Sequence, residues 1–366
     1  MNYKKNKSHK IELWKMVIFV AKSIMMNAKS VFIQLKDNAI KKKRKCMFPG
    51  CSCEAINYSH VFQKNKILNQ LVSNGHLMIF DYKNDGGCIY RSKGVNKAFT
   101  FKGLCQKHDN DLFASIEKEE PNWFDTKSQY LLGYKSICRE FAIKQIAVEI
   151  NSEFVISLNK GIESDYIKVF NRDVEPEFVK SFEENVALYQ IYRKKLVGEK
   201  LGLSDFQTYK EHLEQDIINE SFEKFEFTTI ELPFKLEVCI SAPISNSYSE
   251  IPNEDIARAD LPEMNVINIF PYQNKTMVII GSIKGFPNTW ANKFINKLKS
   301  GNQTTQLKAI SDLIVYRCEF HCMSESLFRK IGKEKFQQYY NLFRRNLYTM
   351  RDIDIDLNLF ENCFEC

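Results

Sequence analysis

The sequence predicts a multidomain α+β protein, and three features lead to this fold class. At 366 residues the chain is longer than one typical domain, so two or three compact units are expected. Two long stretches, 129–150 and 175–227, combine Glu and Lys with large apolar residues at the spacing of amphipathic helices. Residues 228–244 alternate polar and apolar side chains, and residues 266–283 contain two strand-like runs.

Along the chain these features predict four consecutive segments. Residues 1–45 form a basic helical arm, and residues 46–120 a cysteine-bearing zinc domain. Residues 121–226 form a helical region, and residues 227–366 a C-terminal α/β domain of unknown role. A composition of 44% apolar and 27% charged residues is typical of a globular protein. Eleven cysteines without a recognisable secretory signal predict reduced thiols and a cytoplasmic location.

The basic arm concentrates the positive charge of the chain. It contains 13 Lys and Arg residues and two acidic residues, whereas the formal net charge of the whole chain is +7. Every seventh residue from Lys15 to Lys43 is a lysine, so on a helix these side chains lie along one face. Such a face suits nucleic acid, because phosphates bound by Lys and Arg release their counterions. The predicted contacts are Lys15, Lys22, Lys29, Lys36, Lys41, Lys42, Lys43 and Arg44.

Two other interpretations of the arm stay open. It could be a solubilising tail, or its apolar residues, which include Trp14, Val17 and Ile18, could lie in a membrane interface. A transmembrane span is not expected, since uncharged runs such as residues 16–21 are far shorter than the roughly 18 to 20 residues that a bilayer requires. Nucleic acid is the predicted partner of the arm, in preference to a membrane surface, because the lysines recur along one face.

Two short motifs within residues 46–120 indicate a metal site. Cys46 and Cys51 flank a turn, and Cys105 and His108 stand at the start of a predicted helix. Thiolates and imidazoles are the ligands that Zn²⁺ takes in tetrahedral structural sites, and this layout matches a treble-clef zinc knuckle. Cys53 could replace either cysteine of the first pair. The alternative is a group of buried cysteines without a metal.

Around these motifs the chain resembles the HNH, or ββα-metal, endonucleases. In that family a histidine on the first strand acts as general base, and a residue that opens the helix after the second knuckle holds a catalytic divalent ion. Ser59-His60-Val61 falls in the first position and Asp109 in the second. The resemblance implies that His60 activates a water for attack on phosphorus. It also implies that Asp109, with Asn110, holds Mg²⁺ or another divalent ion.

The chain departs from the family pattern in three places. Ser59 stands where the family often has an acidic metal ligand. The interval from His60 to Cys105 is longer than usual and requires an insertion such as residues 65–94. Asn96 is the nearest candidate for the central asparagine of the family, and it lies early. The resemblance covers residues 46–117, about a fifth of the chain.

Residues 105–117 also resemble a pattern found in uncharacterised bacterial HNH-like proteins. The pattern is Cys-x2-His-Asp-x3-Phe-x2-Ile-Glu, and it ends here at Glu117. Proteins of this kind often belong to mobile elements or to phage defence. Glu117 lies about two helical turns beyond Asp109, so it could share a face with the site. The non-functional interpretation of Glu117 is a glutamate that is solvated or forms a salt bridge.

The expected function is metal-dependent hydrolysis of DNA, with structural Zn²⁺ and catalytic Mg²⁺ or a similar ion. The alternative is a non-catalytic treble-clef module that binds nucleic acid or a protein partner, since such modules often serve as scaffolds. The C-terminal domain could also bind a protein partner. The adjacent pair His108-Asp109 also invites comparison with the metal-dependent HD phosphohydrolases. Cys105 would have no role in such a site, so this interpretation is not preferred. Walker loops, dinucleotide fingerprints and nucleophile elbows are absent from the sequence.

Overall fold

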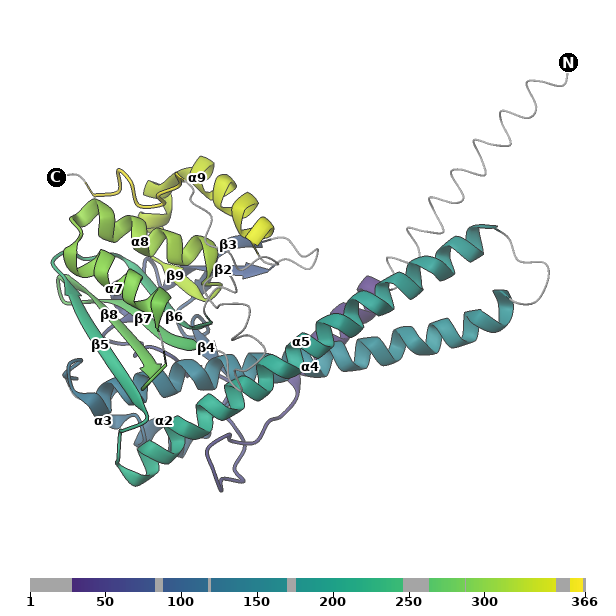
Figure 1. Ribbon diagram of the computed structural model, residues 1–366, viewed down its shortest axis with the longest axis horizontal. Helices are drawn as coiled ribbons and strands as arrows, with labels where there is room; N and C mark the ends of the chain where they lie inside the picture. The colour runs from purple at the N-terminus through teal and green to yellow at the C-terminus, as the bar shows by residue number, and fades with distance from the viewer. Residues whose placement is uncertain are drawn as a thin grey trace, which may run out of the picture. The chain divides into compact units, whose positions relative to one another are not determined.

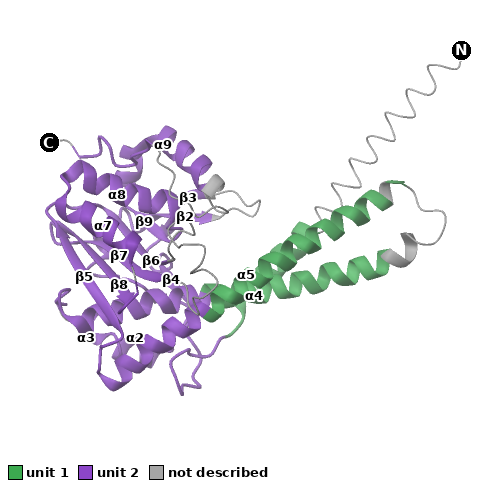
Figure 2. Ribbon diagram, viewed as in Figure 1, with its two compact units in different colours: residues 1–43, 143–204 green, residues 44–142, 205–366 purple. Residues whose placement is uncertain are grey.

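The computed structural model describes residues 28–82, 88–117, 120–169, 176–245, 263–286, 288–346 and 356–364. These residues are 54% helical and 19% strand, which confirms the predicted mixture of helix and sheet. Contacts divide the chain into two compact units, Met1–Lys43 with Ile143–Ser204, and Arg44–Ala142 with Asp205–Cys366 (Figure 2). Both units are discontinuous in sequence, which differs from the predicted division into four consecutive segments.

A seven-stranded antiparallel sheet forms the centre of the second unit (Figure 1). Its strand order is β3-β2-β9-β6-β7-β8-β5, with the three-residue strand β9 between β2 and β6. A two-residue turn joins β7 to β8, where Tyr272 pairs with Lys275 and Gln273 has a φ of 56°. The strands are β2 (His76–Tyr82), β3 (Cys88–Gly94), β5 (Phe225–Leu232), β6 (Val238–Ser245), β7 (Met264–Tyr272), β8 (Lys275–Ile283) and β9 (His321–Met323).

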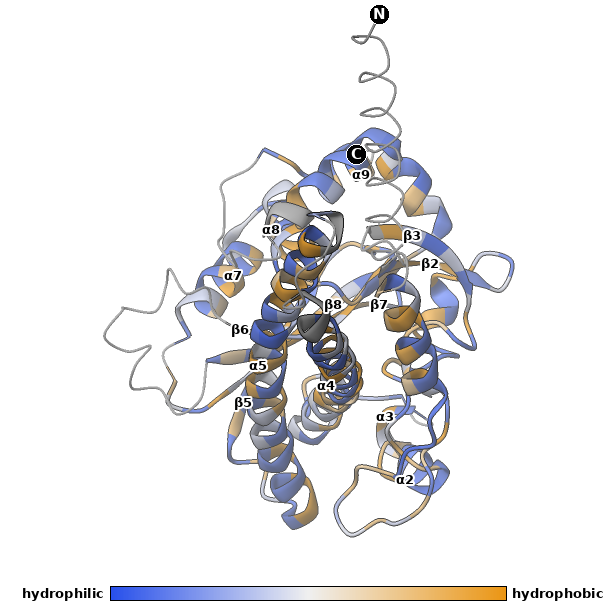
Figure 3. Ribbon diagram, turned by 90° about the vertical axis from the view of Figure 1, so that its right-hand side faces the viewer, coloured by the Kyte–Doolittle hydropathy of each residue, from blue (hydrophilic) through white to orange (hydrophobic). Residues whose placement is uncertain are grey.

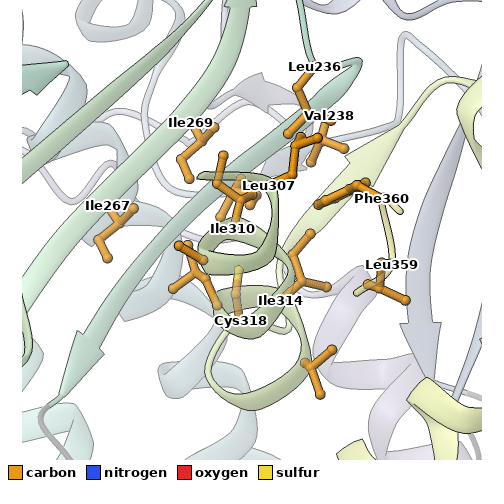
Figure 4. Close-up of a cluster of buried hydrophobic side chains, with 14 of the residues drawn as sticks. Leu236, Val238, Ile267, Ile269, Leu307, Ile310, Ile314, Cys318, Leu359 and Phe360 are labelled. Carbon is orange, nitrogen blue, oxygen red and sulfur yellow. The ribbon is translucent and has the colours of Figure 1, made fainter. Parts of the chain in front are cut away.

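One face of this sheet is covered by α7 (Thr289–Ser300), α8 (Gln303–Tyr316) and α9 (Glu325–Asn346) (Figure 1). Alternate residues of β7 point toward these helices, while on α8 the buried residues recur at spacings of three and four. Figure 4 shows the resulting core, in which side chains of β6, β7, α8 and the C-terminal segment interlock. Its labelled members are Leu236, Val238, Ile267, Ile269, Leu307, Ile310, Ile314, Cys318, Leu359 and Phe360.

The other face of the sheet contacts the first part of α4 (Thr126–Val169). Ser136 of this helix donates a hydrogen bond of 2.9 Å to Asn268 of β7 and accepts one of 2.8 Å from Ser241 of β6. Tyr134 donates to Glu214 of α5 (Pro176–Asn219) over 2.5 Å. The second unit therefore has helices on both faces of its sheet, which explains why β7 and β8 are almost entirely buried.

The first unit is helical. Residues 28–41 form a helix, in which the Phe32 ring lies 5.3 Å from that of Phe154 in α4 and 5.8 Å from that of Tyr192 in α5. Lys144 and Glu199 form an ion pair of 2.7 Å between the two long helices. Figure 3 shows hydrophilic and hydrophobic residues interspersed along both helices. Within the described ranges, none of the helices is both long and apolar enough to cross a membrane.

The insertion between His60 and Cys105 joins the main sheet. Its strands β2 and β3 pair with each other, and β2 also pairs with β9, so that Met78 lies opposite Met323. The insertion also contains a single 3-10 turn, Leu68–Gln70. The cysteine-bearing segment is thus bound to the C-terminal part of the chain by backbone hydrogen bonds.

A substitution at Gly281 of β8 tests the packing between α4 and the sheet. The Phe227 ring fills the space between Gly281 and Gly133 of α4, and a Cβ at position 281 would overlap that ring. We expect Gly281→Ala to lower the free energy of unfolding by about 1–3 kcal/mol, because a well-packed core resists an added methyl group. Denaturant titration measures this. Gly161→Ala, whose Cβ would meet nothing within 4 Å, is the control and should cause no loss.

Candidate metal centre and active site

The four predicted metal ligands meet in the structure. The ligand atoms of Cys46, Cys51, Cys105 and His108 all lie within 4.8 Å of one another. Nδ1 of His108 is 3.3 Å from Sγ of Cys105 and 3.4 Å from Sγ of Cys46, and the sulfurs of Cys51 and Cys105 are 3.9 Å apart. This cluster could bind a metal ion, and the described part of the chain contains no second cluster of this kind.

The first cysteine pair sits on a loop that closes on itself. The amide of Cys46 donates to the carbonyl of Cys53 over 2.8 Å, and the amide of Cys51 donates to that of Phe48 over 3.1 Å. Gly50 has a φ of 72°, in the left-handed region where glycine is unstrained. These bonds turn both sulfurs toward one point, as a two-cysteine ligand loop requires.

The second pair stands where a helix begins. Cys105 is the N-cap of α2 (Gln106–Asp111), and its carbonyl accepts from the amide of Asp109 over 2.9 Å. The amide of Met47 donates to the carbonyl of Gly103 over 2.8 Å, which joins this segment to the cysteine loop. The Phe48 ring stacks on His108 with centroids 4.3 Å apart. Backbone bonds therefore hold the two ligand pairs together independently of any ion.

His60 ends the strand β1 (Ser59–His60), which pairs with β4 (Thr100–Phe101). Its Nε2 lies 3.0 Å from the carbonyl oxygen of Val95. Because a carbonyl only accepts, Nε2 carries the proton, and Nδ1 of the neutral ring keeps its lone pair. Burial lowers the pKa of His60 below its usual 6.5, and the positive charges of Lys135 and Lys64 lower it further.

Asp109 lies on α2 and is buried, and its charge acts on the His60 ring. Its Oδ1 accepts a short hydrogen bond from the Ser59 hydroxyl and lies 3.6 Å from Nζ of Lys135. Among the described residues no hydrogen bond or ion pair reaches the other carboxylate oxygen, Oδ2. The structure thus brings together two predicted catalytic residues and leaves one carboxylate oxygen available.

Lys135 of α4 links both residues to Glu117 of α3 (Ala114–Glu117). Its Nζ donates to the carbonyl of His60 over 3.0 Å and pairs with Oε1 of Glu117. Glu117, expected to share a face with the site or to be salt-bridged, therefore contacts the same ammonium group as Asp109. The side chains of Ser59, Asp109, Glu117 and Lys135 are joined to one another, and His60 is joined to them through its backbone carbonyl; these five residues are called the His60 cluster below.

Asn110 is not part of the His60 cluster. It is exposed, and its side-chain oxygen accepts a hydrogen bond of 2.9 Å from Gln106 on the outer side of α2. Asn96 likewise pairs with Lys64 over 3.1 Å, although its neighbour Val95 supplies the carbonyl that orients His60. Cys53 is exposed and does not belong to the four-ligand cluster.

Part of the predicted nucleic-acid contact set falls on the described chain. Lys29, Lys41, Lys42 and Lys43 are exposed, while Lys36 and Arg44 are half-buried. Lys42 forms an ion pair of 2.5 Å with Glu149, which offsets part of the positive charge. Lys15 and Lys22 lie outside the described residues. The basic contacts remain a prediction.

Sequence reasoning missed Lys135 and Val95. The sequence could have indicated Lys135, because it is the one charged residue in the otherwise uncharged segment Tyr-Leu-Leu-Gly-Tyr-Lys-Ser-Ile-Cys at 130–138. A lone charge on the buried side of a helix needs partners and so indicates a polar site. Val95 acts through its backbone carbonyl, and no sequence pattern could have found it.

The lowered pKa of His60 makes a testable prediction for pH. Just below pH 6.5, His60 becomes protonated in the unfolded chain but stays neutral in the folded protein. The free energy of unfolding therefore decreases as the pH is lowered from about 6.5 to the pKa of His60 in the folded protein. We expect an NMR titration of the His60 ring to show a midpoint below 6.5. A midpoint at or above 6.5 would contradict the burial that the structure shows.

Comparisons of this chain with protein-family models, with curated proteins and with solved structures find no match. The geometry of the metal centre and of the His60 cluster is therefore the basis for assigning a function.

Proposed function

We propose that the protein is a metal-dependent endonuclease that hydrolyses phosphodiester bonds, in DNA rather than RNA. The observation that carries this proposal is His60, whose Nε2–H is held by the Val95 carbonyl and whose pKa is lowered. Hydrolysis needs a base that is unprotonated near neutral pH to take a proton from the attacking water. Nδ1 of His60 is such a base, with the Asp109 carboxylate beside it.

The metal that we propose for the four-ligand cluster is Zn²⁺. Three thiols and one imidazole are a donor set that structural zinc prefers. A cysteine loop, a two-stranded sheet and a helix opened by the second ligand pair also correspond to a treble clef. Here the ligands connect the loop before β1 with the start of α2, which are the elements that carry His60 and Asp109. The ion would stabilise the site and take no part in proton transfer.

A second, catalytic ion of the Mg²⁺ type is part of the proposal. Oδ2 of Asp109 would be its protein ligand, since Oδ1 is taken by Ser59 and Lys135. When bound, such an ion supplies positive charge for the phosphate and the leaving oxygen. Asn110, which pairs with Gln106, has no contact that supports an additional ligand role.

The exposed lysines of the arm would bind the phosphate backbone outside the bond that is cut. Lys29, Lys41, Lys42 and Lys43 are the exposed members of the described set. Contacts of this kind raise affinity without selecting a sequence. A cytoplasmic location and a setting in phage defence or a mobile element complete the proposal.

One observation favours a different function, a non-catalytic module that binds nucleic acid or a protein. The ammonium group of Lys135 lies against Asp109 and offsets the negative charge with which this carboxylate would attract a divalent ion. A protein that uses the cluster only for structure would show the same contact. The two functions differ in whether phosphodiester bonds are cut.

Cleavage assays distinguish these functions. Wild-type protein is incubated with supercoiled plasmid, duplex DNA, single-stranded DNA and RNA, each with Mg²⁺, Mn²⁺ or Ni²⁺. The nuclease proposal predicts ion-dependent cutting of DNA above that of RNA. Binding without cutting under every ion would support the module instead.

A further inference from the structure

We propose that Lys135 is a positioning residue of the His60 cluster, which fixes His60 and Asp109 and weakens the binding of a divalent ion beside them. This inference rests on the proposed nuclease function. Nothing in the sequence motifs around the cysteines assigns a role to this lysine, because it lies on a different helix.

Lys135 is a buried lysine whose ammonium group has an oxygen neighbour for each of its three N–H groups. Its side chain is only 1% exposed, and Nζ has three oxygen neighbours: the carbonyl of His60 at 3.0 Å, Oε1 of Glu117, and Oδ1 of Asp109 at 3.6 Å. An ammonium group has three N–H donors, so each can be directed at one oxygen. The same group lies 4.3 Å from the centroid of the Phe113 ring.

Burying this charge costs free energy that two carboxylates offset. A buried ion pair is seldom a net source of stability compared with apolar residues of similar size, so stability alone gives a weak reason for Lys135. A more specific consequence is that one group holds three different segments together, namely β1, α2 and α3. These segments carry the proposed base and the proposed ion ligand.

His60 is held at two points as a result. Lys135 binds its carbonyl, and the carbonyl of Val95 binds its Nε2, so the backbone and the ring are both fixed. Asp109 is held through Oδ1 by Ser59 and Lys135, which leaves Oδ2 for the ion. Lys135 itself is too buried to touch a substrate. It acts through these two residues.

The charge of Lys135 has a second effect, on the ion. A positive charge within a few ångströms of Oδ2 repels a divalent cation, and at an effective dielectric constant of about 20 this is enough to weaken binding by about tenfold or more. Loss of the lysine should therefore tighten ion binding while it loosens the catalytic geometry. A variant that is simply less well folded would not show these opposite changes.

The test compares Lys135→Met with Lys210→Met. Lys210 is a second buried lysine, paired with Glu214 and 5% exposed, and no contact joins it to His60, Asp109 or Glu117. Binding of Mn²⁺ is measured by electron paramagnetic resonance on zinc-loaded protein, and cleavage is measured on the same samples. We expect Lys135→Met to bind Mn²⁺ about tenfold or more tightly and to cleave at least tenfold more slowly. Lys210→Met should leave both quantities at wild-type values.

Unchanged or weaker Mn²⁺ binding in Lys135→Met, equal behaviour of the two variants, or no Mn²⁺ binding in any protein would overturn the inference. If Lys135→Met does not fold, Lys135→Gln removes the charge and keeps a donor for the His60 carbonyl, and it should show the same tightening. Absence of cleavage by the wild type, with tighter Mn²⁺ binding in the variant, would refute the nuclease function and leave the effect of Lys135 on the ion intact.

Discussion

His60→Ala is expected to reduce the rate of DNA cleavage by about 10²–10⁴-fold, the usual contribution of a general base. The substitution removes an imidazole whose pKa is lowered by burial and on which the Asp109 charge acts. It leaves the four-ligand cluster intact, because His60 supplies none of those ligands. Single-turnover cleavage of a short duplex, measured between pH 6 and 9, gives the rate ratio.

His76→Ala is the matched control for this prediction. His76 begins β2, and its Nδ1 lies 2.8 Å from the carbonyl of Asn74 in an exposed turn, so it too has a ring nitrogen on a backbone oxygen. It is exposed, and no contact joins it to Asp109 or Lys135. Equal losses in the two variants, or wild-type rates in His60→Ala, would remove His60 from the reaction.

Cys105→Ser is expected to cause the largest loss of stability. Apparent free energies of zinc binding in small zinc-binding peptides are about 10–16 kcal/mol, which is similar to the whole stability of a typical domain. Cys105 is 4% exposed and directly precedes α2, the helix that carries Asp109, so losing its thiolate removes a buried ligand next to that helix. We expect the variant to be purified with less than one zinc per chain and to unfold at a markedly lower temperature.

Cys53→Ser provides the comparison, since Cys53 is exposed and lies outside the four-ligand cluster. It should retain one zinc per chain and the wild-type unfolding temperature. Treatment of the wild type with a strong chelator should reproduce the effect of Cys105→Ser. Retention of zinc with wild-type affinity in Cys105→Ser would mean that Cys53 or another group replaces it.

The four-ligand cluster could be predicted from sequence because its determinants are local. Each ligand pair lies within a few residues, one on a turn and one at a helix start, and such geometry follows from backbone preferences near glycine and at an N-cap. The structure places the two pairs together as expected. The fold class could be predicted for the same reason, because the periodicity of helices and strands can be recognised within short segments of the sequence.

The remaining features depend on contacts between distant parts of the chain. The pairing of Met78 with Met323 joins strands that are far apart in sequence, and hydrophobic patterns do not identify the partner of a strand. The same limit applies to Lys135, which reaches His60 and Asp109 from another helix. Ser59 could be read only as a missing acidic ligand, whereas the structure shows it donating to Asp109.

The most direct test of the account is the nicking of supercoiled plasmid by wild-type and His60→Ala proteins with matched, measured zinc contents. We expect one zinc per chain in both proteins, nicking by the wild type that requires an added divalent ion, and little or no nicking by His60→Ala. Nicking at the same rate by both proteins would contradict it, as would zinc-loaded wild-type protein that binds DNA and leaves it intact with every ion.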